Sequence, residues 1–474
     1  MLYTRGAPAI YNQWASVTGY PEWAWDGVEP FFRRIEKSQG GPVQTTQHAP
    51  LFGFYKYIEK SAVALGLQSH QNINSASAPA SGHFYLDYTI DCRGFRHSAL
   101  RSYLPLELAL RRRGRLAICT GATVTRLELD VKGCLVTGVR VKSAKEKIEA
   151  VILPRREVIV CGGAISTPQL LQLSGIGPAP LLKQQDIPLK HDLPVGVHLA
   201  DHWGIPISTE LPFNETFHFM EQSSMQALWQ VARFLVGRGG WMRSPSTQSA
   251  IFMNTSHMDT KSFRMRLGDA ELDASRHENI PDVEIMVIPA NAAPGTQPGK
   301  SLATLYVCLL QTQSEGSVRI ASSDPDVDPR IHTCLFTDPG DIEVARNALR
   351  FTLSLTEHFM TSSGYPYRAR LAVAPRIDGE FQDVRDHELD EFARTNARAV
   401  LHLGCTCRMG KKEKGGVVDE ELRVHGVANL RVADASVFPI LPATHTMAPT
   451  YMVAERCAEF IKNTWKAKND VHSW

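Results

Sequence analysis

A short apolar strand that stops at paired glycines constrains the fold of this chain more than any other feature. The branched residues Val158-Ile159-Val160 are followed by Cys161-Gly162-Gly163 and then by a helical segment from Ser166 to Leu173. A strand that passes through glycines into a helix is typical of the βα turn of a parallel sheet, and glycine lets a backbone or a ligand approach closely there. We therefore predict an α/β domain with a parallel sheet.

The same pattern returns near the C-terminus. Residues 430–436 form a strand that leads into a turn, and a helix is predicted from Met447 to Trp465 because apolar side chains recur on one face. Between these two regions, residues 203–395 contain longer helical segments and scattered strands, such as the one at 316–320. We predict that this middle stretch forms a separate layer, inserted between two parts of the parallel-sheet domain.

Shorter patterns predict three further elements in the first third of the chain. They are a helix from Val28 to Ile35, a strand near Leu116 to Cys119, and a hairpin strand from Leu135 to Val141.

Length and composition limit the kind of protein. A chain of 474 residues suits two domains, or one composite of two interleaved halves. Hydrophobic residues make up 43% and charged residues 21%, as in ordinary globular proteins, and no apolar run approaches the roughly 18 to 20 residues of a membrane-spanning helix. The net charge of +2 gives no general field for nucleic acid or anionic lipid, and we interpret the basic run Arg111 to Arg115 as a solvated turn. We expect a soluble protein whose partners are small molecules.

The cysteines and the first residues give little information about function or location. Nine cysteines without a regular framework argue against a disulfide scaffold. Cys405-Thr406-Cys407 is too tight for a zinc pair without a second Cys or His doublet, so no metal site is predicted. Residues Met1 to Trp14 show no signal-peptide pattern. This leaves the location open between cytoplasmic and secreted.

Two histidines are the first candidates for chemistry. His402 lies in the segment 402–410 and His445 in the segment 442–449, and both segments are predicted loops, where site residues concentrate. Taken alone, any one of the 17 histidines is more often a surface or satisfied residue than a catalyst.

Several segments resemble the signatures of the glucose-methanol-choline (GMC) oxidoreductases. They are residues 163–177 with the sequence GAISTPQLLQLSGIG, residues 194–202 with PVGVHLADH, and a C-terminal run through residues 416–436 and 455–456. The spacing of His402 and His445 also suits the catalytic pair of that family. The resemblance covers essentially the whole chain and is weakest over residues 203–300.

The resemblance implies an α/β fold in which an incomplete Rossmann-like FAD-binding domain is interleaved with a substrate domain. The substrate domain is expected to be built on a mainly antiparallel sheet with helices. Five segments follow from it. Residues 1–47 are a residual N-terminal FAD-domain or lid segment, residues 48–98 a substrate-domain segment, and residues 99–202 an FAD-binding segment. Residues 203–395 form the substrate-binding domain, and residues 396–474 a C-terminal FAD-domain segment with both histidines.

The resemblance also assigns roles to the histidines. It implies that His402 is the active-site base and that His445 is its partner on the far side of the substrate hydroxyl. Hydride removal from an alcohol carbon requires negative charge to build on the oxygen, so one group takes the hydroxyl proton while another holds the oxygen. The expected activity is FAD-dependent oxidation of a primary or secondary alcohol, with hydride transfer to flavin N5.

The same resemblance implies contacts to the cofactor FAD. Val124 would touch the adenine side, Asp434 and Ala435 would lie by the diphosphate and ribityl chain, and Met447 would lie by the flavin ring. Ordinary strand packing remains an equal alternative for Val124 and Ala435. The residues near the last helix have a physical rationale, because a helix N-terminus offers free N–H groups and a positive dipole end.

The front of the chain departs from the family pattern. No Gly-x-Gly-x-x-Gly fingerprint occurs, and Met1 to Gly6 resembles a family segment that lies well downstream. We therefore expect an N-terminally truncated member that binds FAD poorly as it stands. Two alternatives stay open: a lyase or cyclase of specialised metabolism, or an inactive, partner-binding form without flavin. The alcohol, and whether oxygen or another acceptor reoxidises the flavin, are also left open.

Overall fold

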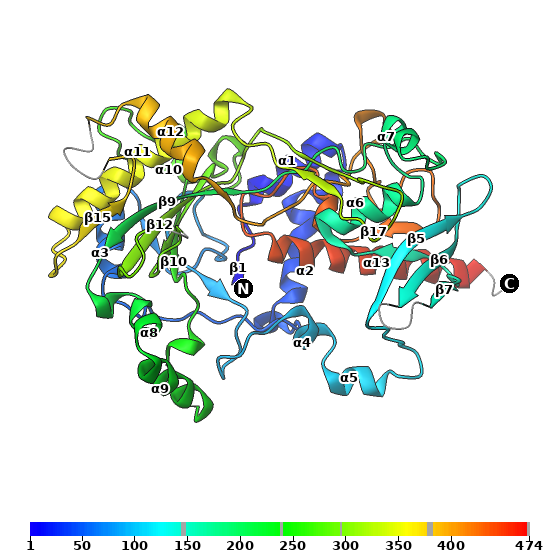
Figure 1. Cartoon of the computed structure of the whole chain (residues 1–474), viewed down its shortest axis with the longest axis horizontal. Helices are drawn as coiled ribbons and strands as arrows, with labels where there is room; N and C mark the ends of the chain where they lie inside the picture. Colours follow the sequence, from blue (N-terminus) through cyan, green and yellow to red (C-terminus); the bar gives the residue numbers. More distant parts are fainter. Residues whose placement is uncertain (144–147, 238–239, 294–295, 377–382, 472–474) are drawn as a thin grey trace.

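The computed structural model describes residues 1–143, 148–237, 240–293, 296–376 and 383–471, and it has two parts that lie side by side (Figure 1). One part holds a large, mainly antiparallel sheet with helices, and the other holds α6, α13 and a smaller three-stranded sheet. The α/β fold class predicted from the sequence is confirmed. The division into five domain segments stays a prediction.

The helices of the described residues are α1 (Pro8–Thr18), α2 (Trp25–Ile35), α3 (Tyr55–Ala64), α4 (Ala99–Tyr103), α5 (Leu106–Arg111), α6 (Gly163–Leu173), α7 (Ala179–Gln184), α8 (His218–Gln222), α9 (Ser224–Leu235), α10 (Asp269–Leu272), α11 (Pro339–Thr361), α12 (Asp386–Asn396) and α13 (Met447–Val471). The strands are β1 (Leu2–Tyr3), β2 (Ser69–His70), β3 (Gly82–Tyr85), β4 (Asp87–Tyr88), β5 (Ala122–Leu129), β6 (Val136–Ser143), β7 (Glu149–Ile152), β8 (Val158–Val160), β9 (Trp203–Glu210), β10 (Ser249–Met253), β11 (Val283–Ile288), β12 (Leu302–Leu309), β13 (Ser317–Arg319), β14 (Arg330–His332), β15 (Arg370–Val373), β16 (Arg398–Ala399) and β17 (Leu430–Val432).

The large sheet has the strand order β15-β9-β12-β11-β10-β3-β2, and β16 also pairs with β9. Its pairs are antiparallel except β2 with β3. Successive side chains of a strand point to opposite faces. On β10, Ile251 packs into the core that α3 and α11 cover, whereas Phe252 packs into the core on the other face. The face that carries Phe252, called the second face below, lies toward the C-terminal loops.

The long helix α11 covers the first face because its sequence provides both a start signal and an apolar stripe. The Asp338 carboxylate accepts a hydrogen bond from the Gly340 N–H at 2.8 Å, and Pro339 occupies the first turn, where it needs no N–H acceptor. Ile342, Ala345 and Leu349 recur at helical spacing and are buried against the sheet. This packing fixes the sheet, and therefore the side chains on its second face.

The two βα regions meet as the sequence predicted. β8 and β17 form a parallel pair in which Val158 lies opposite Leu430 and Val160 opposite Val432. Each strand leads toward a helix, α6 after β8 and α13 after the loops that follow β17 (Figure 1). The predicted helix at 447–465 is confirmed and extends to Val471, and the predicted strand at 316–320 is observed as β13.

Of the three shorter elements, the helix ending at Ile35 is observed as α2 and the hairpin strand as β6. The strand predicted near Leu116 to Cys119 is wrong, because these residues carry no strand assignment. A short apolar run makes a strand only when a neighbouring strand accepts its backbone hydrogen bonds. In the described residues, no strand pairs with this segment.

None of the helices within the described ranges combines the length and the apolar character that a bilayer-crossing helix needs.

A buried ion pair joins the parallel strands to the last helix. Arg431 on β17 is 1% exposed, and its Nε donates to Glu157 Oε2 at 2.7 Å, just before β8. The same guanidinium donates to Thr464 Oγ1 on α13 at 3.1 Å and to the Glu421 carbonyl. The indole N–H of Trp465 donates to the other Glu157 oxygen at 2.5 Å. One pair of charges therefore holds β8, β17 and α13 together.

We expect Arg431→Met to lower the free energy of unfolding by about 3 to 5 kcal/mol, because it leaves the Glu157 carboxylate buried and unpaired. Adding Glu157→Gln should recover part of that loss, since no uncompensated charge then remains. Urea denaturation of the single and double variants measures both. Arg33→Met removes an exposed pair with Glu29 and serves as the control, with an effect within about 0.5 kcal/mol. A single Arg431 variant as stable as this control would contradict the prediction.

Candidate active site

His402 and His445 lie on two loops that the fold anchors separately. The His402 backbone N–H donates to Asp201 Oδ1 at 2.6 Å, just after the short strand β16. The His445 backbone N–H donates to Thr4 Oγ1 at 3.2 Å, just before α13. Residues far apart in the sequence therefore fix both backbones.

The structure brings the two imidazoles into direct contact. His402 Nε2 and His445 Nδ1 are 3.3 Å apart, and the rings meet edge to face with centroids 4.9 Å apart at 84°. The prediction that the two lie on opposite sides of a substrate hydroxyl needs adjustment. At this separation, an oxygen that bonds to both nitrogens must lie to one side of the line that joins them.

The contact extends into a chain of four side chains. His402 Nδ1 lies 2.9 Å from His202 Nδ1, and His445 Nε2 lies 3.0 Å from Glu284 Oε1. Glu284 is 1% exposed and comes from the middle of β11. It points to the second face of the large sheet, where its neighbours across the strands are Phe252 and Cys308. The order of the chain is Glu284, His445, His402, His202.

Burial dominates the electrostatics of this chain. The pKa of His402 is held well below its usual range by burial and then by the neighbouring His445 and His202. Burial, followed by His445, lowers the pKa of His202 to about 3. Burial raises the pKa of Asp201 to about 6, against the opposing effect of backbone N–H donors. His402 and His202 are therefore neutral imidazoles near pH 7.

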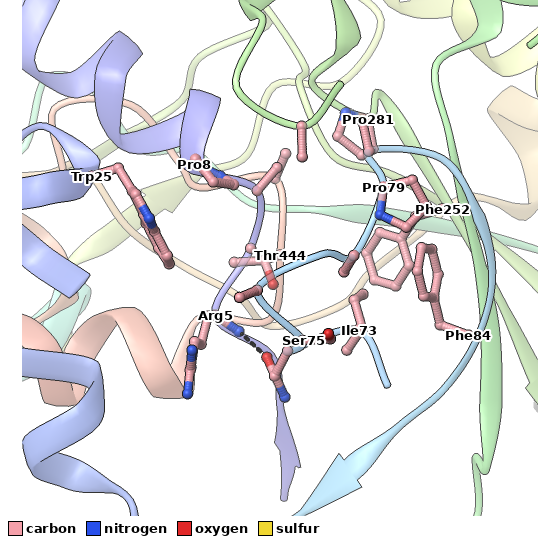
Figure 2. Close-up of a pocket in the computed structure, with 18 of the residues that line it drawn as sticks. Arg5, Pro8, Trp25, Ile73, Ser75, Pro79, Phe84, Phe252, Pro281 and Thr444 are labelled. Carbon is pink, nitrogen blue, oxygen red and sulfur yellow. Dashed lines mark hydrogen bonds between the residues drawn. The ribbon is translucent and has the colours of Figure 1, made fainter. Parts of the chain in front are cut away.

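A pocket of about 100 Å³ is lined in part by Thr444, the residue before His445 (Figure 2). Phe84 and Phe252 lie together on one wall, with Trp25 across from them and Thr444 between. Thr444 precedes His445 in the chain. The pocket therefore lies near His445, but none of the four side chains of the chain is part of its lining.

One charged side chain of the pocket is already neutralised. The Arg5 guanidinium makes two hydrogen bonds to the Glu36 carboxylate, at 2.7 and 2.6 Å, and the Arg5 backbone N–H donates to Asn74 Oδ1 (Figure 2). The rest of the lining is mostly small or apolar. Such a lining suits an uncharged or aromatic group better than an anion.

The residues predicted to hold the cofactor lie in two places. Asp434 and Ala435 lie at the end of β17, where Asp434 Oδ2 accepts from Gly163 N at 2.9 Å and from Thr167 Oγ1 at 2.6 Å. Met447 begins α13, two residues after His445. Val124 lies apart from them on β5 in the three-stranded sheet, 43% exposed.

The βα turn after β8 has the open backbone that a cofactor would need. Gly163 has φ +79°, and a Cβ added there would meet no atom within 4 Å. The N-terminal end of α6 begins at this glycine, and that of α13 begins beside the histidine pair. Glycine backbone and helix N-termini are groups that accommodate phosphates and anionic rings. The turn at Gly163 is open to close approach, but its N–H already donates to Asp434, so the helix end that fits an anionic flavin ring is the start of α13.

Sequence reasoning missed His202, Glu284 and Asp201 as members of the site. Two signals were available. Asp201 and His202 end the segment 194–202, which carries the family resemblance, and Glu284 is the only charged residue of the otherwise apolar strand β11. A lone carboxylate in a central strand is rarely buried without a partner.

Comparison with known proteins decides the family. The two models of the GMC oxidoreductases match residues 1–204 and 312–454. The chain belongs to the GMC oxidoreductase family. An oxygen-dependent choline dehydrogenase of Pseudomonas savastanoi pv. phaseolicola is 30% identical over 480 residues, which cover 98% of this chain and 77% of the relative. Another from Yersinia pseudotuberculosis is also 30% identical, with the same shares covered.

Several solved structures share the fold. An FAD-dependent oxidoreductase from Chaetomium thermophilum superposes with a TM-score of 0.83 at 24% identity, covering 98% of this chain and 85% of the other. A fungal aryl-alcohol oxidase gives 0.81 at 23%, with 98% and 84% covered. The predictions of a GMC-type fold, and of an alcohol-oxidising oxidoreductase with FAD as the cofactor of the family, are confirmed. These names favour the oxidoreductase over the lyase, the cyclase and the inactive form.

Two residues that flank the His402 loop have a left-handed backbone. Leu401 has φ +66° and the fully buried Cys405 has φ +70°. A residue with a Cβ pays about 1 to 2 kcal/mol for this conformation, whereas glycine does not.

We expect Cys405→Gly to be more stable than Cys405→Ala by about 1 kcal/mol, because both remove the thiol but only glycine relieves the backbone. Thermal and urea unfolding of the two variants measure the difference. The same substitutions at Cys407, which is buried nearby without a positive φ, should give the opposite order. An alanine variant at 405 as stable as the glycine variant would show that the backbone is not strained there.

Acid should destabilise the folded protein through its buried histidines. The unfolded chain protonates His202 below its ordinary pKa of 6.5, whereas the folded chain does not until about pH 3, so stability falls as pH drops below 6.5. Asp201 acts in the opposite direction between pH 6 and 3.8, because the folded state then holds the extra proton. The lowered pKa of His402 destabilises the folded protein in acid in the same way as that of His202, so the net effect of acid is a loss of stability.

In His202→Gln, the stability lost between pH 6.5 and 5 should shrink by about 1 to 2 kcal/mol, since one titrating imidazole is gone. Urea midpoints at the two pH values measure this loss. His387→Gln, at an exposed position of α12, should behave as the parent protein. An unchanged pH dependence in His202→Gln would show that His202 is not held neutral by the fold.

Proposed function

We propose that this protein oxidises a primary or secondary alcohol with FAD, and that His402 and His445 are the groups that bind the reacting hydroxyl. The observation that carries the proposal is the 3.3 Å contact between His402 Nε2 and His445 Nδ1 beside the pocket. A nitrogen that accepts and a nitrogen that donates, close together and away from water, are the two groups that alcohol oxidation needs.

The two imidazoles are proposed to act on the hydroxyl in different ways. One imidazole accepts the hydroxyl proton, and the N–H of the other donates a hydrogen bond to the oxygen as negative charge grows on it. His445 is buried and His402 is half-buried, which limits the access of water and strengthens that hydrogen bond. FAD, when bound, supplies the acceptor for the hydride of the carbinol carbon.

Four residues are proposed to hold the cofactor. Met447, at the start of α13, is assigned to the flavin ring, where the helix N-terminus stabilises negative charge. Asp434 and Ala435 at the end of β17 are assigned to the diphosphate and ribityl chain, beside the open turn at Gly163. Val124 is assigned to the adenine side, and its exposed position on β5 is compatible with that role.

The pocket indicates the kind of alcohol. Its aromatic walls, Phe84, Phe252 and Trp25, favour an alcohol with an apolar or aromatic substituent. Relatives and structural neighbours are named for choline, pyridoxine and aryl alcohols. A panel of these alcohols, assayed with oxygen and with a quinone, identifies both the substrate and the electron acceptor.

The direct test of the function uses the flavin spectrum. The protein is reconstituted with FAD, freed of unbound cofactor, and mixed anaerobically with each alcohol of the panel. Loss of the yellow colour on addition of an alcohol supports the proposal. Failure of every alcohol to reduce protein-bound flavin, under conditions where dithionite does, argues against it.

In the FAD-loaded protein, His402→Ala and His445→Ala should each slow flavin reduction by about 10² to 10⁴, because each removes one of the two groups on the hydroxyl. Stopped-flow absorbance measures the rate. His387→Ala, at an exposed histidine of α12, is the matched control and should reduce at the parental rate. Reduction at that rate in either of the first two variants would remove the assigned residue from the site.

A further inference from the structure

A second cleft, of about 400 Å³, lies between the hairpin of β13 and β14 and the short helix α7. The segment 195–197 forms its remaining wall. Figure 1 shows α7 at the upper edge of the part that holds α6 and β17. None of the residues assigned to the alcohol or to the flavin lines this cleft. It is therefore a concave site separate from the one described above.

Three basic side chains share the face of the hairpin that lines the cleft. Arg319 on β13 lies directly opposite Arg330 on β14. His332 follows two residues after Arg330, and residues two apart on a strand point to the same face. All three side chains line the cleft. Val318, which points to the other face, is fully buried in the core.

The two arginines carry charges that the described residues leave unneutralised. Both are exposed, neither makes an ion pair within the described ranges, and no carboxylate appears in the lining of the cleft. Directly opposite residues of an antiparallel pair have Cβ atoms about 4.5 to 5.5 Å apart, so like charges there destabilise the pair. In the other pocket, by contrast, Arg5 is neutralised by Glu36.

The nearby carboxylates do not face the two arginines. Those closest along the chain all lie outside the lining of the cleft: Asp186, Glu315, Asp324, Asp326 and Asp328. Asp326, in the loop of the hairpin, accepts a hydrogen bond from Lys142 on β6, and Asp324 acts on the same lysine. Glu315 accepts a hydrogen bond from Arg408. The cleft therefore keeps a net positive field, which its concave shape concentrates.

The walls of the cleft are held in place by one buried glutamine. Gln172, near the end of α6, is fully buried, and its Nε2 donates to the carbonyls of Val195 and Val318 at 2.9 Å each. Its Oε1 accepts from the Ile320 N–H, also at 2.9 Å. These hydrogen bonds fix the segment 195–197 against β13. A ligand that enters the cleft therefore meets a formed site, and ordering the walls costs little binding free energy.

The position of Gln172 also separates the cleft from the proposed flavin contacts. The turn beside Asp434 is at Gly163, where α6 begins. Gln172 comes nine residues later, which is about 14 Å along a helix. An anion in the cleft is therefore not the diphosphate of a flavin bound at that turn.

We propose that this cleft binds a small molecule that carries a phosphate group, with Arg319 and Arg330 both on the phosphate. A guanidinium is a planar fork of donors that matches phosphate oxygens in pairs. A phosphate monoester carries a charge of about −1.5 to −2 at neutral pH, which equals the charge of two guanidinium groups. A single carboxylate would leave one of the two positive charges unpaired. His332 adds a further group that hydrogen-bonds to the same anion.

The rest of the lining suits the carbon part of such a molecule. Leu181, Val197 and Ile320 present apolar surface, and Gln184 and Gln185 present side-chain amides. A volume of about 400 Å³ is within the range of sites for small organic ligands and exceeds what inorganic phosphate fills. The ligand class is therefore a phosphate ester of a small, partly apolar group.

Titration calorimetry of the full chain with phenyl phosphate tests the site. We expect one saturable site that excess FAD does not displace, with affinity weakened about 10- to 100-fold in Arg319→Gln and in Arg330→Gln, because each loses charged hydrogen bonds to the anion. Arg113→Gln, at an exposed arginine of the basic run 111–115, is the matched control and should bind as the parent does. Absence of saturable binding, or parental affinity in both cleft variants, overturns the proposal.

Unfolding in urea without any ligand separates binding from structure. Since Arg319→Gln removes a like charge opposite Arg330, its urea midpoint should equal or slightly exceed that of the parent. Phenyl phosphate should raise the midpoint of the parent and of Arg113→Gln, and raise it less in Arg319→Gln. A midpoint that falls together with the affinity would make Arg319 a structural residue and overturn its role in binding.

Two further anions of similar size test the chemical class at matched ionic strength. Benzenesulfonate carries one negative charge, and phthalate carries two carboxylates. We expect both to bind more weakly than phenyl phosphate, and inorganic phosphate to compete with it. Equal affinity for all three organic anions would indicate charge attraction alone, and tighter binding of phthalate would assign the cleft to dicarboxylates; either result overturns the phosphate class. None of these measurements requires flavin, so their outcome is independent of the proposed function.

Discussion

The hydrogen bond between His445 and Glu284 joins the two parts of the molecule at the site. Glu284 comes from the middle of the antiparallel sheet, and His445 comes from the loop that starts α13. A carboxylate buried to 1% exposure is costly unless a partner compensates it. The pair therefore ties the position of the C-terminal loop to the register of the sheet. Everything else in the site is arranged around that connection.

The register of the sheet decides that Glu284 faces the histidines at all. On β11, Val283 and Ile285 pack under α11, while Glu284 and Met286 point to the other face. A shift of one residue would turn the carboxylate into the apolar core beneath α11. Strong packing on that side, by Leu349 and its neighbours, prevents such a shift. The stability of one face thus fixes the chemistry of the other.

Much of the framework could be predicted from local patterns. The turn at Gly162-Gly163 and the strand at 430–432 each carry their own signal, because glycine and short branched runs act within a few residues. The helix α13 was predicted from its apolar stripe. The strand predicted near Leu116 failed for the opposite reason: a strand needs a partner, and a pattern in one segment does not contain its neighbour. The contact of His402 with His445 followed from family resemblance and not from spacing alone.

Local patterns in the chain were enough to indicate an α/β GMC-type protein with two loop histidines of chemical interest. They did so because βα turns, helical stripes and signature segments are local in the chain. The three-dimensional packing was needed to show that His202 and Glu284 complete the arrangement, one on each side of the pair. These residues are separated from their partners by 200 and 161 positions, and hydrogen bonds act over about 3 Å of space. No local pattern encodes such a meeting, which follows from the packing of the sheet against the loops.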